Sequence, residues 1–263
     1  FRKRFAKAMR QKRYSSDLTD SQWEQISRYF TTGRKRSYSL RYHVLDAILY
    51  VVKTGTQWRM LPGEFAQWQT VYYYFRRWRQ EGRILCILSI TSRAVRRRSG
   101  RHGGPSALII DCQSVPSTRV GGISSFDAFK KVNGRKRHIA VDTQGLLWGL
   151  VVHAAGDHET QWALQLLAPV ASRLGRVKTV FADQAYQGLE ETLKDELDWD
   201  LQVVESDDEN SGFSVDPKRW IVERTYGWFG GWRRLDREYE RRTDSSETMV
   251  YFAMLRIALN RLD

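Results

Sequence analysis

ALIIDCQSV at residues 107–115 and VKTVFAD at residues 177–183 are the stretches that decide the fold. Both are short, continuously apolar runs, which is typical of strands in a sheet that is covered on both faces. The first run contains Asp111, and the second ends on Asp183. An unpaired charge is costly to bury, and a divalent cation is one of the few good partners for a carboxylate there. The two acids therefore predict a metal site at this sheet.

A third acid lies in PKRWIVERTYGWF at residues 217–229, which predicts a helix that begins near Pro217 and carries Glu223. Taken singly, a strand Asp is more often a turn or cap residue, and Glu223 beside Arg224 fits a surface ion pair. All three acids in this order favour a site for two magnesium or manganese ions about 4 Å apart. Two such ions can activate water or a 3′-hydroxyl for in-line phosphodiester displacement.

The order of the surrounding elements predicts an α/β, ribonuclease-H-like fold. In chain order we expect strands at 107–115 and across 137–154 with a turn at 143–145, a helix at 159–175, a strand at 177–183, a helix at 189–197, a strand at 201–206, the helix with Glu223, and a closing apolar helix at 251–262. An antiparallel start followed by alternating helices and strands is what distinguishes this fold. The closing helix is expected against the core or a second subunit.

Residues 17–92 predict an all-α domain. LTDSQWEQISRYF starts with Thr19 as an N-cap and Gln22 three residues later, which is the pattern of a capping box. A longer apolar helix is expected to end near Gly55, and a third follows the turn TQWRMLPGEF. This is the order of a helix-turn-helix-like unit, and we expect it to contact DNA, with a merely solvated face as the alternative. The cations on its last helix are Arg76, Arg77 and Arg79.

Charge and composition divide the chain into four parts. We expect a basic arm at 1–16, the helical DNA-binding domain at 17–92, a linker rich in Arg, Gly and Ser at 93–106, and a catalytic domain at 107–263. The first hundred residues contain 22 Lys and Arg against 6 Asp and Glu, and the remainder contains 21 against 24. So uneven a charge predicts a polyanionic partner, and the interleaved aromatic residues favour nucleic acid over a membrane surface.

The remaining composition excludes several classes of protein. Cys86 and Cys112 form no CxxC motif, so neither a disulfide framework nor a structural zinc site is expected. No apolar run approaches the roughly 20 residues that cross a bilayer, and no hydrophobic signal core precedes the first helix. We expect a soluble protein of a reducing cytoplasm without a membrane partner.

Several longer motifs coincide with one known family. They are YSSDLTDSQWE, TGTQWRMLP with the following WQTVYYYFRRW, DCQSV, KKVNGRKRHIAVDTQG, FADQAY and RWIVERTYGWFGGWRRL. Over about residues 14–262 the chain resembles bacterial insertion-sequence transposases of the DDE type, particularly the group named for insertion sequence five. The resemblance implies that Asp111, Asp183 and Glu223 form the metal site that cuts transposon ends and joins them to target DNA. It also implies end binding by the N-terminal helices, a homodimer or larger assembly on double-stranded DNA, and a place at the bacterial nucleoid.

Related transposases carry a motif of Tyr, two residues, Arg, three residues, Glu, six residues and Lys. This chain keeps Arg219 and Glu223 at that spacing but has Asp216 at the Tyr position and Gly230 at the Lys position. One helical turn from Glu223, Arg219 is expected to hold a DNA phosphate, with a surface ion pair as the alternative. The neighbouring cations expected at DNA are Arg224, Arg233 and Arg234, of which the last two are candidates to replace the missing Lys.

A second cationic run precedes and enters the strand after DCQSV. We expect it to form a track for DNA phosphates, with a solvated hairpin turn as the alternative. Its members are Lys130, Lys131, Arg135, Lys136 and Arg137.

Some conspicuous side chains have two interpretations. Trp228 and Trp232 could stack on a displaced base, although aromatic residues at helical spacing usually belong to the core. His153 and His158 are expected to be structural, and Asp157 to be a loop or cap residue rather than a fourth metal ligand.

Two other functions fit part of the pattern. One is a metal-dependent nuclease of the same fold that cuts without joining, and the other is a domesticated DNA-binding protein without catalysis. Strand-transfer product separates the first from a transposase, and substitution of the three acids separates the second.

Overall fold

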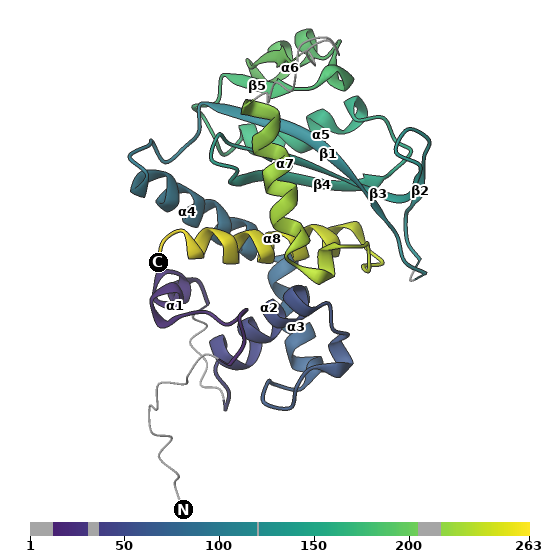
Figure 1. Cartoon of the computed structure of the whole chain (residues 1–263). Helices are drawn as coiled ribbons and strands as arrows, with labels where there is room; N and C mark the ends of the chain where they lie inside the picture. The colour runs from purple at the N-terminus through teal and green to yellow at the C-terminus, as the bar shows by residue number, and fades with distance from the viewer. Residues whose placement is uncertain (1–12, 31–36, 120, 205–216) are drawn as a thin grey trace, which may run out of the picture.

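The computed structural model of the chain describes residues 13–30, 37–119, 121–204 and 217–263, with residues 217–219 described by their backbone only. Figure 1 shows a mixed sheet above, the N-terminal helices below, and α8 (Thr243–Asn260) between them. In these ranges no helix is both long and apolar enough to span a membrane.

The sheet has the strand order β2-β3-β1-β5-β6, with β4 also paired to β3. Its strands are β1 (Ala107–Pro116), β2 (Ser125–Asp127), β3 (Val132–Val141), β4 (Leu147–Ala154), β5 (Thr179–Ala182) and β6 (Asp200–Val203). The first four pair antiparallel, whereas β5 pairs parallel to both β1 and β6. The predicted mixed α/β order is therefore confirmed, and β2 is the strand that the sequence did not reveal.

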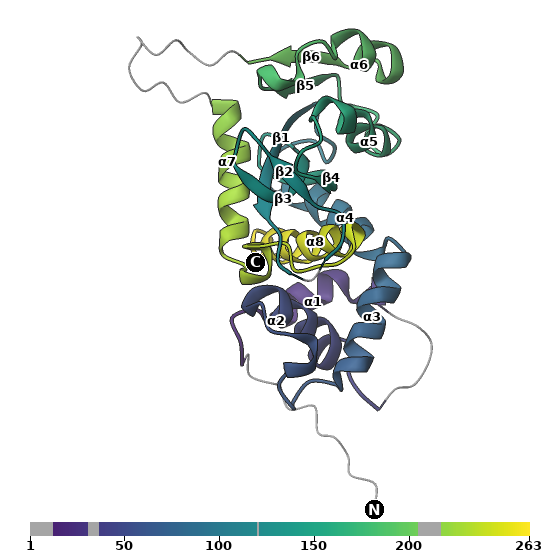
Figure 2. The ribbon, with the colours of Figure 1, turned by 90° about the vertical axis from the view of Figure 1, so that its right-hand side faces the viewer.

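Helices cover both faces of this sheet. Figure 2 shows α7 (Pro217–Gly230) on one side of the strands and α5 (Thr160–Ala171) on the other. Alternate residues of β1 divide between these faces because successive strand side chains point in opposite directions. Ile109 joins the core cluster that contains α7 residues, whereas Leu108 and Ile110 join the cluster of α5. The continuous apolar run of β1 thus reflects burial on both faces. The small α6 (Glu190–Leu197) packs beside β6.

The N-terminal region is helical as predicted. Its helices are α1 (Asp20–Ile26), α2 (Asp46–Thr54), α3 (Trp68–Gln80) and α4 (Arg83–Arg98). Thr19 and Gln22 form the expected reciprocal capping box at the start of α1. Gly55 ends α2 at φ 73°, a left-handed conformation that glycine adopts without strain.

Two of the expected boundaries differ from the structure. The linker prediction at 93–106 is wrong for its first part, because α4 continues to Arg98. Val95 is buried there, and Arg96 forms a buried ion pair of 2.7 Å with Asp142, so this basic stretch is held by tertiary contacts. The arm prediction at 1–16 covers 1–12, which lie outside the described residues. From Arg13 onward the backbone is anchored by hydrogen bonds to the carboxylate of Asp17.

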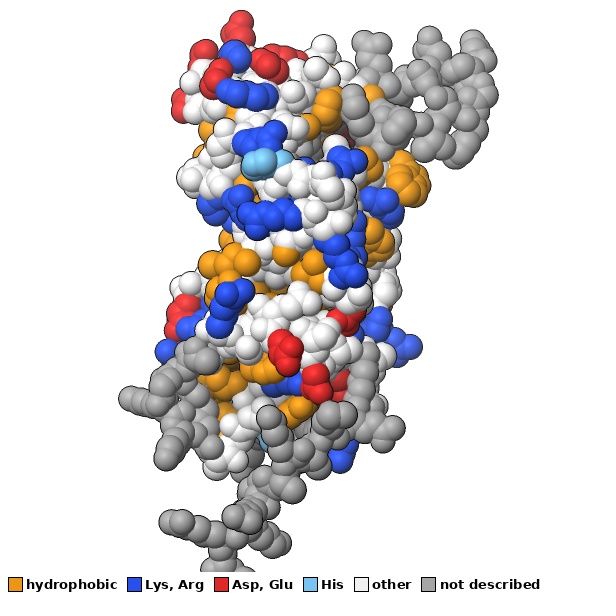
Figure 3. All heavy atoms as spheres, turned by 90° about the vertical axis from the view of Figure 1, so that its left-hand side faces the viewer, with side chains coloured by type: hydrophobic (Ala, Val, Ile, Leu, Met, Phe, Trp, Pro, Cys, Tyr) orange, Lys and Arg blue, Asp and Glu red, His pale blue; other side chains and the backbone are white. Residues whose placement is uncertain are grey.

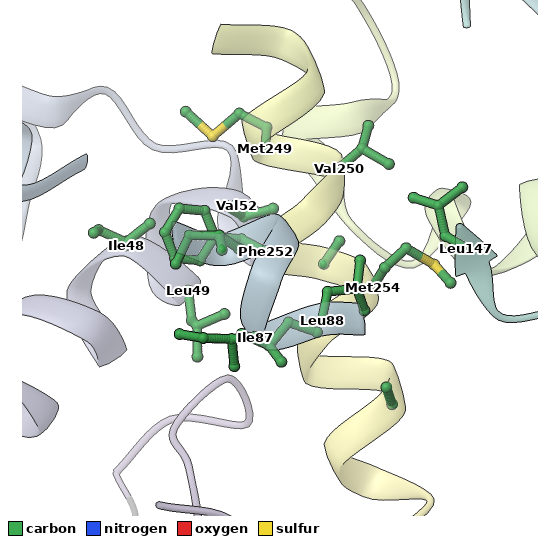
Figure 4. Packing of buried hydrophobic residues seen from close by; sticks show 14 of the residues in the cluster. Ile48, Leu49, Val52, Ile87, Leu88, Leu147, Met249, Val250, Phe252 and Met254 are labelled. Carbon is green, nitrogen blue, oxygen red and sulfur yellow. The ribbon is translucent and has the colours of Figure 1, made fainter. Parts of the chain in front are cut away.

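One apolar core joins the helical region to the sheet. Figure 4 shows α8 at its centre, with side chains from α2, α4 and β4 packed around it. The labelled members are Ile48, Leu49, Val52, Ile87, Leu88, Leu147, Met249, Val250, Phe252 and Met254. The predicted closing helix therefore exists, begins at Thr243 rather than near 251, and packs on the core of its own chain.

Candidate active site

The register between β1 and β5 aligns two of the three predicted acids. Ile109 pairs with Phe181 in this parallel ladder, so the positions two residues further along are Asp111 and Asp183. Residues i and i+2 of a strand point to the same face. Ile109 and Phe181 both contact the core cluster on the α7 face, so the two aspartates belong to that face as well. Neighbouring strands lie about 5 Å apart, which makes these positions direct neighbours.

The turn after β5 fixes the backbone at Asp183. β5 ends at Ala182, and Asp183 is the N-cap of a short 3-10 turn at Gln184–Tyr186. Its Oδ1 atom accepts a hydrogen bond of 3.0 Å from the backbone N–H of Ala185. The residue is exposed, so its second carboxylate oxygen has access to solvent.

Tyr226 holds α7 across the sheet close to Asp111. Its hydroxyl lies 2.8 Å from the backbone oxygen of Asp111 and 2.9 Å from that of Arg137. Burial raises the pKa of Tyr226 well above its usual value, so the hydroxyl keeps its proton and donates. Glu223 lies almost one helical turn before Tyr226 and is exposed. Figure 1 shows α7 crossing in front of β1, and the two elements are in contact.

The structure does not bring the three acids together around one point. Among the residues that the structure describes, no three or more His, Cys, Asp or Glu side chains are grouped closely enough to hold a metal ion. Their chemistry nevertheless fits a hard cation, because all three donors are carboxylate oxygens and two of them are exposed. A metal site of Asp111, Asp183 and Glu223 stays a prediction.

A buried hydrogen bond supports the Asp183 turn from the α5 face. The hydroxyl of Tyr186 and Nε2 of His138 are 2.7 Å apart, which connects the turn to β3. Burial raises the pKa of Tyr186 well above its usual value and lowers the pKa of His138 to about 3, so both groups are neutral. We did not predict either role, although Tyr186 stands one turn after Asp183 in FADQAY and Tyr226 stands three residues after Glu223.

Most of the predicted phosphate track is buried. Arg135 and Arg137 are each only 1% exposed. Their guanidinium groups pair with the carboxylate of Glu238, at 3.4 Å for Arg135 and 2.6 Å for Arg137. Backbone carbonyls of residues 235, 240 and 241 accept further hydrogen bonds from them. This geometry does not support DNA contact by these two residues, because a buried charge that has a carboxylate partner is not available to phosphate.

Lys136 is also engaged inside the protein, on the opposite face. Its ammonium lies 2.6 Å from Glu159, whose carboxylate also accepts a hydrogen bond of 3.1 Å from the thiol of Cys112. Burial alone would raise the pKa of Glu159, but Lys136 and Cys112 outweigh it and lower that pKa. Burial raises the pKa of the Cys112 thiol, which stays protonated. Of the predicted track, Lys130 and Lys131 are the exposed members.

The cations around α7 differ in exposure. Arg219 lies on α7, but its side chain is outside the described residues. The guanidinium of Arg224 lies between two rings, 4.6 Å from Trp220 and 5.1 Å from Trp228. Arg233 is exposed, whereas Arg234 is buried and pairs with Glu240 at 2.7 Å. Of the two candidates for the missing Lys, Arg233 is therefore the accessible one.

The three cations of α3 also differ. Arg76 is exposed, Arg77 pairs with Glu81 at 2.7 Å, and Arg79 pairs with Asp244 of α8 at 3.4 Å. Arg79 therefore joins α3 to α8, whereas Arg76 is open to solvent.

The predicted structural role of the histidine region agrees with its contacts. His153 is buried and stacks on Trp162, with ring centroids 4.8 Å apart. Asp157 accepts a hydrogen bond of 3.1 Å from the Trp162 indole, and His158 bonds to Thr160. Trp232 is buried in the core, as the structural alternative expected.

A further basic surface lies where we expected a linker. Figure 3 shows the side of the molecule on which α4 lies, with Lys and Arg spread across its middle and Asp and Glu gathered at the end that holds α6. The exposed arginines at the end of α4 and just after it are Arg97, Arg98 and Arg101.

Comparisons with known proteins identify the family of the chain. A family model described as "Transposase DDE domain" matches residues 102–260, and one described as "Putative transposase of IS4/5 family" matches residues 18–87. The chain is 27% identical over 191 residues to "Putative transposase for insertion sequence element IS402" of Burkholderia cepacia, which covers 67% of this chain and 88% of the relative. It is 30% identical over 79 residues to "Uncharacterized protein y4sN" of Sinorhizobium fredii (strain NBRC 101917 / NGR234), which covers 29% of this chain and 63% of that protein. Because the DDE-domain model matches more than half of this chain, the chain belongs to the DDE transposases of bacterial insertion sequences.

Proposed function

We propose that the chain binds the terminal inverted repeats of its insertion sequence, cleaves the DNA there and transfers the strand to target DNA. The observation that supports this proposal is the parallel pairing of Ile109 with Phe181, each two residues before one of the aspartates, in a sheet whose strand β1 contacts α7. DDE transposase domains depend in general on a divalent metal. We assign the three acids as its ligands and expect two Mg²⁺ or Mn²⁺ ions.

The chain's own residues have distinct tasks in this proposal. Bound ions would activate the attacking hydroxyl and stabilise the departing oxygen. Asp111 on β1 and Asp183 just after β5 would provide two of the carboxylate ligands, and Glu223 on α7 would provide the third. Tyr226 keeps α7 in register with β1 through the Asp111 carbonyl. Arg219 holds a phosphate beside the acids from one turn away on α7.

We assign end recognition to the helix-turn-helix-like part of the N-terminal region. One stripe of α3 is exposed at helical spacing, which gives this helix a face that a DNA groove could cover. Gln and Arg are the side chains that form bidentate hydrogen bonds with adenine and guanine. The stripe consists of Gln69, Tyr73, Arg76 and Gln80. Two transposon ends must meet for strand transfer, so we expect a homodimer or larger assembly on DNA.

An assay with pre-cut end DNA tests the proposal. A labelled duplex that carries the terminal inverted repeat with a free 3′-hydroxyl is mixed with Mg²⁺, a plasmid target and the full chain. We expect joined product from the unchanged protein and none from Asp111→Asn, Asp183→Asn or Glu223→Gln. Asp195→Asn is the matched control, because Asp195 is an exposed acid on α6.

The same assay separates the alternatives. A second substrate with an uncut end is run beside the pre-cut one. If the chain cleaves the uncut end strongly but forms no joined product, it is a nuclease and not a transposase. Unchanged cellular activity of all three acid variants would instead leave a non-catalytic DNA-binding protein.

A further inference from the structure

The turn between β2 and β3, residues 128–131, is here called the tip, and its Phe129 is 88% exposed. Two other large apolar side chains near β2 are also exposed, Ile123 by 64% and Phe126 by 57%. An exposed large apolar side chain is a candidate for an interaction site, because its exposure to water is unfavourable. The same turn also carries the two exposed lysines of the cationic run, Lys130 and Lys131.

The tip is held in place by a buried acid. The Oδ1 atom of Asp127 accepts hydrogen bonds of 3.0 Å from the backbone N–H groups of both Phe129 and Lys130. Its Oδ2 atom accepts one of 2.6 Å from the hydroxyl of Ser114 on β1. Asp127 is buried, and these bonds attach the turn to the sheet. Phe129 is therefore presented on a fixed backbone, which lowers the ordering cost of binding.

Charge identifies the kind of partner. Within residues 121–131 the exposed charged side chains are Lys130 and Lys131, both basic, whereas the acid Asp127 is buried. The Lys130 ammonium lies 5.2 Å from the centre of the Phe129 ring. An exposed aromatic ring with an ammonium group beside it, next to a second exposed lysine, fits an unstacked base step and its phosphates, because apolar wedges enter DNA between base pairs.

The distance from the aspartates is suitable for duplex DNA. Asp111 and Pro116 lie on the same strand, and Pro116 pairs with Gly134 at the end of β3 that leads to the tip. Five residues of a strand span about 17 Å. The turn lies beyond Gly134, so the tip is farther from Asp111 than this span of β1. One turn of B-form DNA is about 34 Å, so a duplex cut at Asp111 and lying along β1 would reach the tip within about one turn.

We propose that Phe129 inserts between base pairs of the transposon end, within about one turn of the cut, while Lys130 and Lys131 bind the flanking phosphates. This inference rests on the proposed function, because it names a contact with the same DNA. It assigns Phe129 to shaping the DNA and leaves cleavage to the acids.

A fluorescent base tests the insertion. Terminal-repeat duplexes carry 2-aminopurine at successive positions, and each is titrated with the full chain in Ca²⁺ so that binding is read without cleavage. We expect the unchanged protein and Phe129→Trp to unstack one step, seen as a local rise in fluorescence. We expect Phe129→Ala to abolish that rise and to weaken binding about tenfold, since stacking on one base is worth ~1–3 kcal/mol. Glu191→Ala, at an exposed position of α6, is the control.

The possible failures are distinguishable. If the unchanged protein binds and cuts the end but Phe129→Ala keeps the fluorescence rise, the insertion is refuted and the proposed function stands. If Phe129→Ala instead converts a dimer to a monomer in light scattering with unchanged DNA affinity, the tip contacts a second copy and the inference is also refuted. No end binding by the unchanged protein would refute both the proposed function and the inference. Equal melting temperatures of the variants show that the chain remains folded.

Discussion

Lys130 and Lys131 belong to the same cationic run as Arg135 and Arg137, yet the two pairs have opposite environments. The lysines lie on a turn and are exposed, whereas the arginines lie on β3 and are buried against Glu238. The alternation of side chains along β3 explains this difference. Arg135 and Arg137 point to the same face as Ile139, which is part of the core. Positive charge alone therefore does not identify a DNA contact, and the partner carboxylate decides which cation is available.

Glu238→Gln is the strongest test of this contrast. Two buried guanidinium groups would lose their shared carboxylate, and an uncompensated buried charge costs ~3–5 kcal/mol. We expect a loss of that size in the free energy of unfolding, measured by urea titration. Asp236→Asn, at an exposed neighbour, should change it by less than ~0.5 kcal/mol. Equal effects of the two variants would show that the ion pairs do not stabilise the fold.

Glu247 extends the contrast to a buried acid. Burial raises its pKa from the usual 4.5 to about 7, and the groups beside it include the backbone N–H of Val152 and the acids Asp244 and Glu238. The folded state therefore holds the proton more tightly than the unfolded chain. The stability that this proton contributes is present below pH 4.5 and is lost as the pH rises through 7.

We expect this change to amount to ~3 kcal/mol between pH 4.5 and 7.5. Glu247→Gln keeps an oxygen for the Val152 N–H and should flatten that part of the pH profile of unfolding. Glu196→Gln, at an exposed acid of α6, should leave it unchanged. An unaltered slope in Glu247→Gln would contradict the raised pKa.

Tyr226→Phe tests whether the hydrogen bonds of the Tyr226 hydroxyl to β1 and β3 support the predicted metal site. The hydroxyl contacts the carbonyls of Asp111 and Arg137, and its removal should cost ~1 kcal/mol of unfolding free energy. We also expect slower strand transfer with unchanged end affinity, because α7 would lose its attachment beside Asp111. Tyr251→Phe, whose hydroxyl bonds to the Leu150 carbonyl away from the acids, should affect stability only. Equal kinetics of the two variants would place Tyr226 outside the site.

The exposed lysines give the smallest effect on stability. Replacement of both Lys130 and Lys131 by Ala should leave the unfolding free energy within ~0.5 kcal/mol of the unchanged protein. Each phosphate contact contributes about 0.9 to the slope of log affinity against log salt, so that slope should become less steep by about 2. Fluorescence anisotropy over a salt series measures it. A slope that does not change would remove these residues from the DNA surface.

Local patterns explain which parts of the fold were predictable. The apolar runs located β1 and β5, and the Thr19 capping box located α1, because these signals arise within a few neighbouring residues. The parallel pairing of β1 with β5 agrees with the expectation that both aspartates belong to one sheet. The metal site of the three acids stays a prediction, because their separation depends on how α7 packs on the sheet.

The features that escaped prediction depend on distant partners. Arg135 and Arg137 looked like DNA contacts because Glu238 follows about a hundred positions later and no local signal announces it. The basic end of α4 looked like a linker because Asp142, the partner of Arg96, lies on another element. From sequence alone a charged run looks solvent-exposed, because the side chain of opposite charge that pairs with it lies far away in the chain.

The place of α8 also bears on biosynthesis. α8 follows every other described element in the chain, yet α2, α4 and β4 all pack against it. A nascent chain that has not yet emerged through residues 243–260 still exposes the apolar faces of these earlier elements. Completion of the N-terminal core therefore waits until residues 243–260 have been synthesised, and a nascent chain that still lacks them would present apolar surface to chaperones.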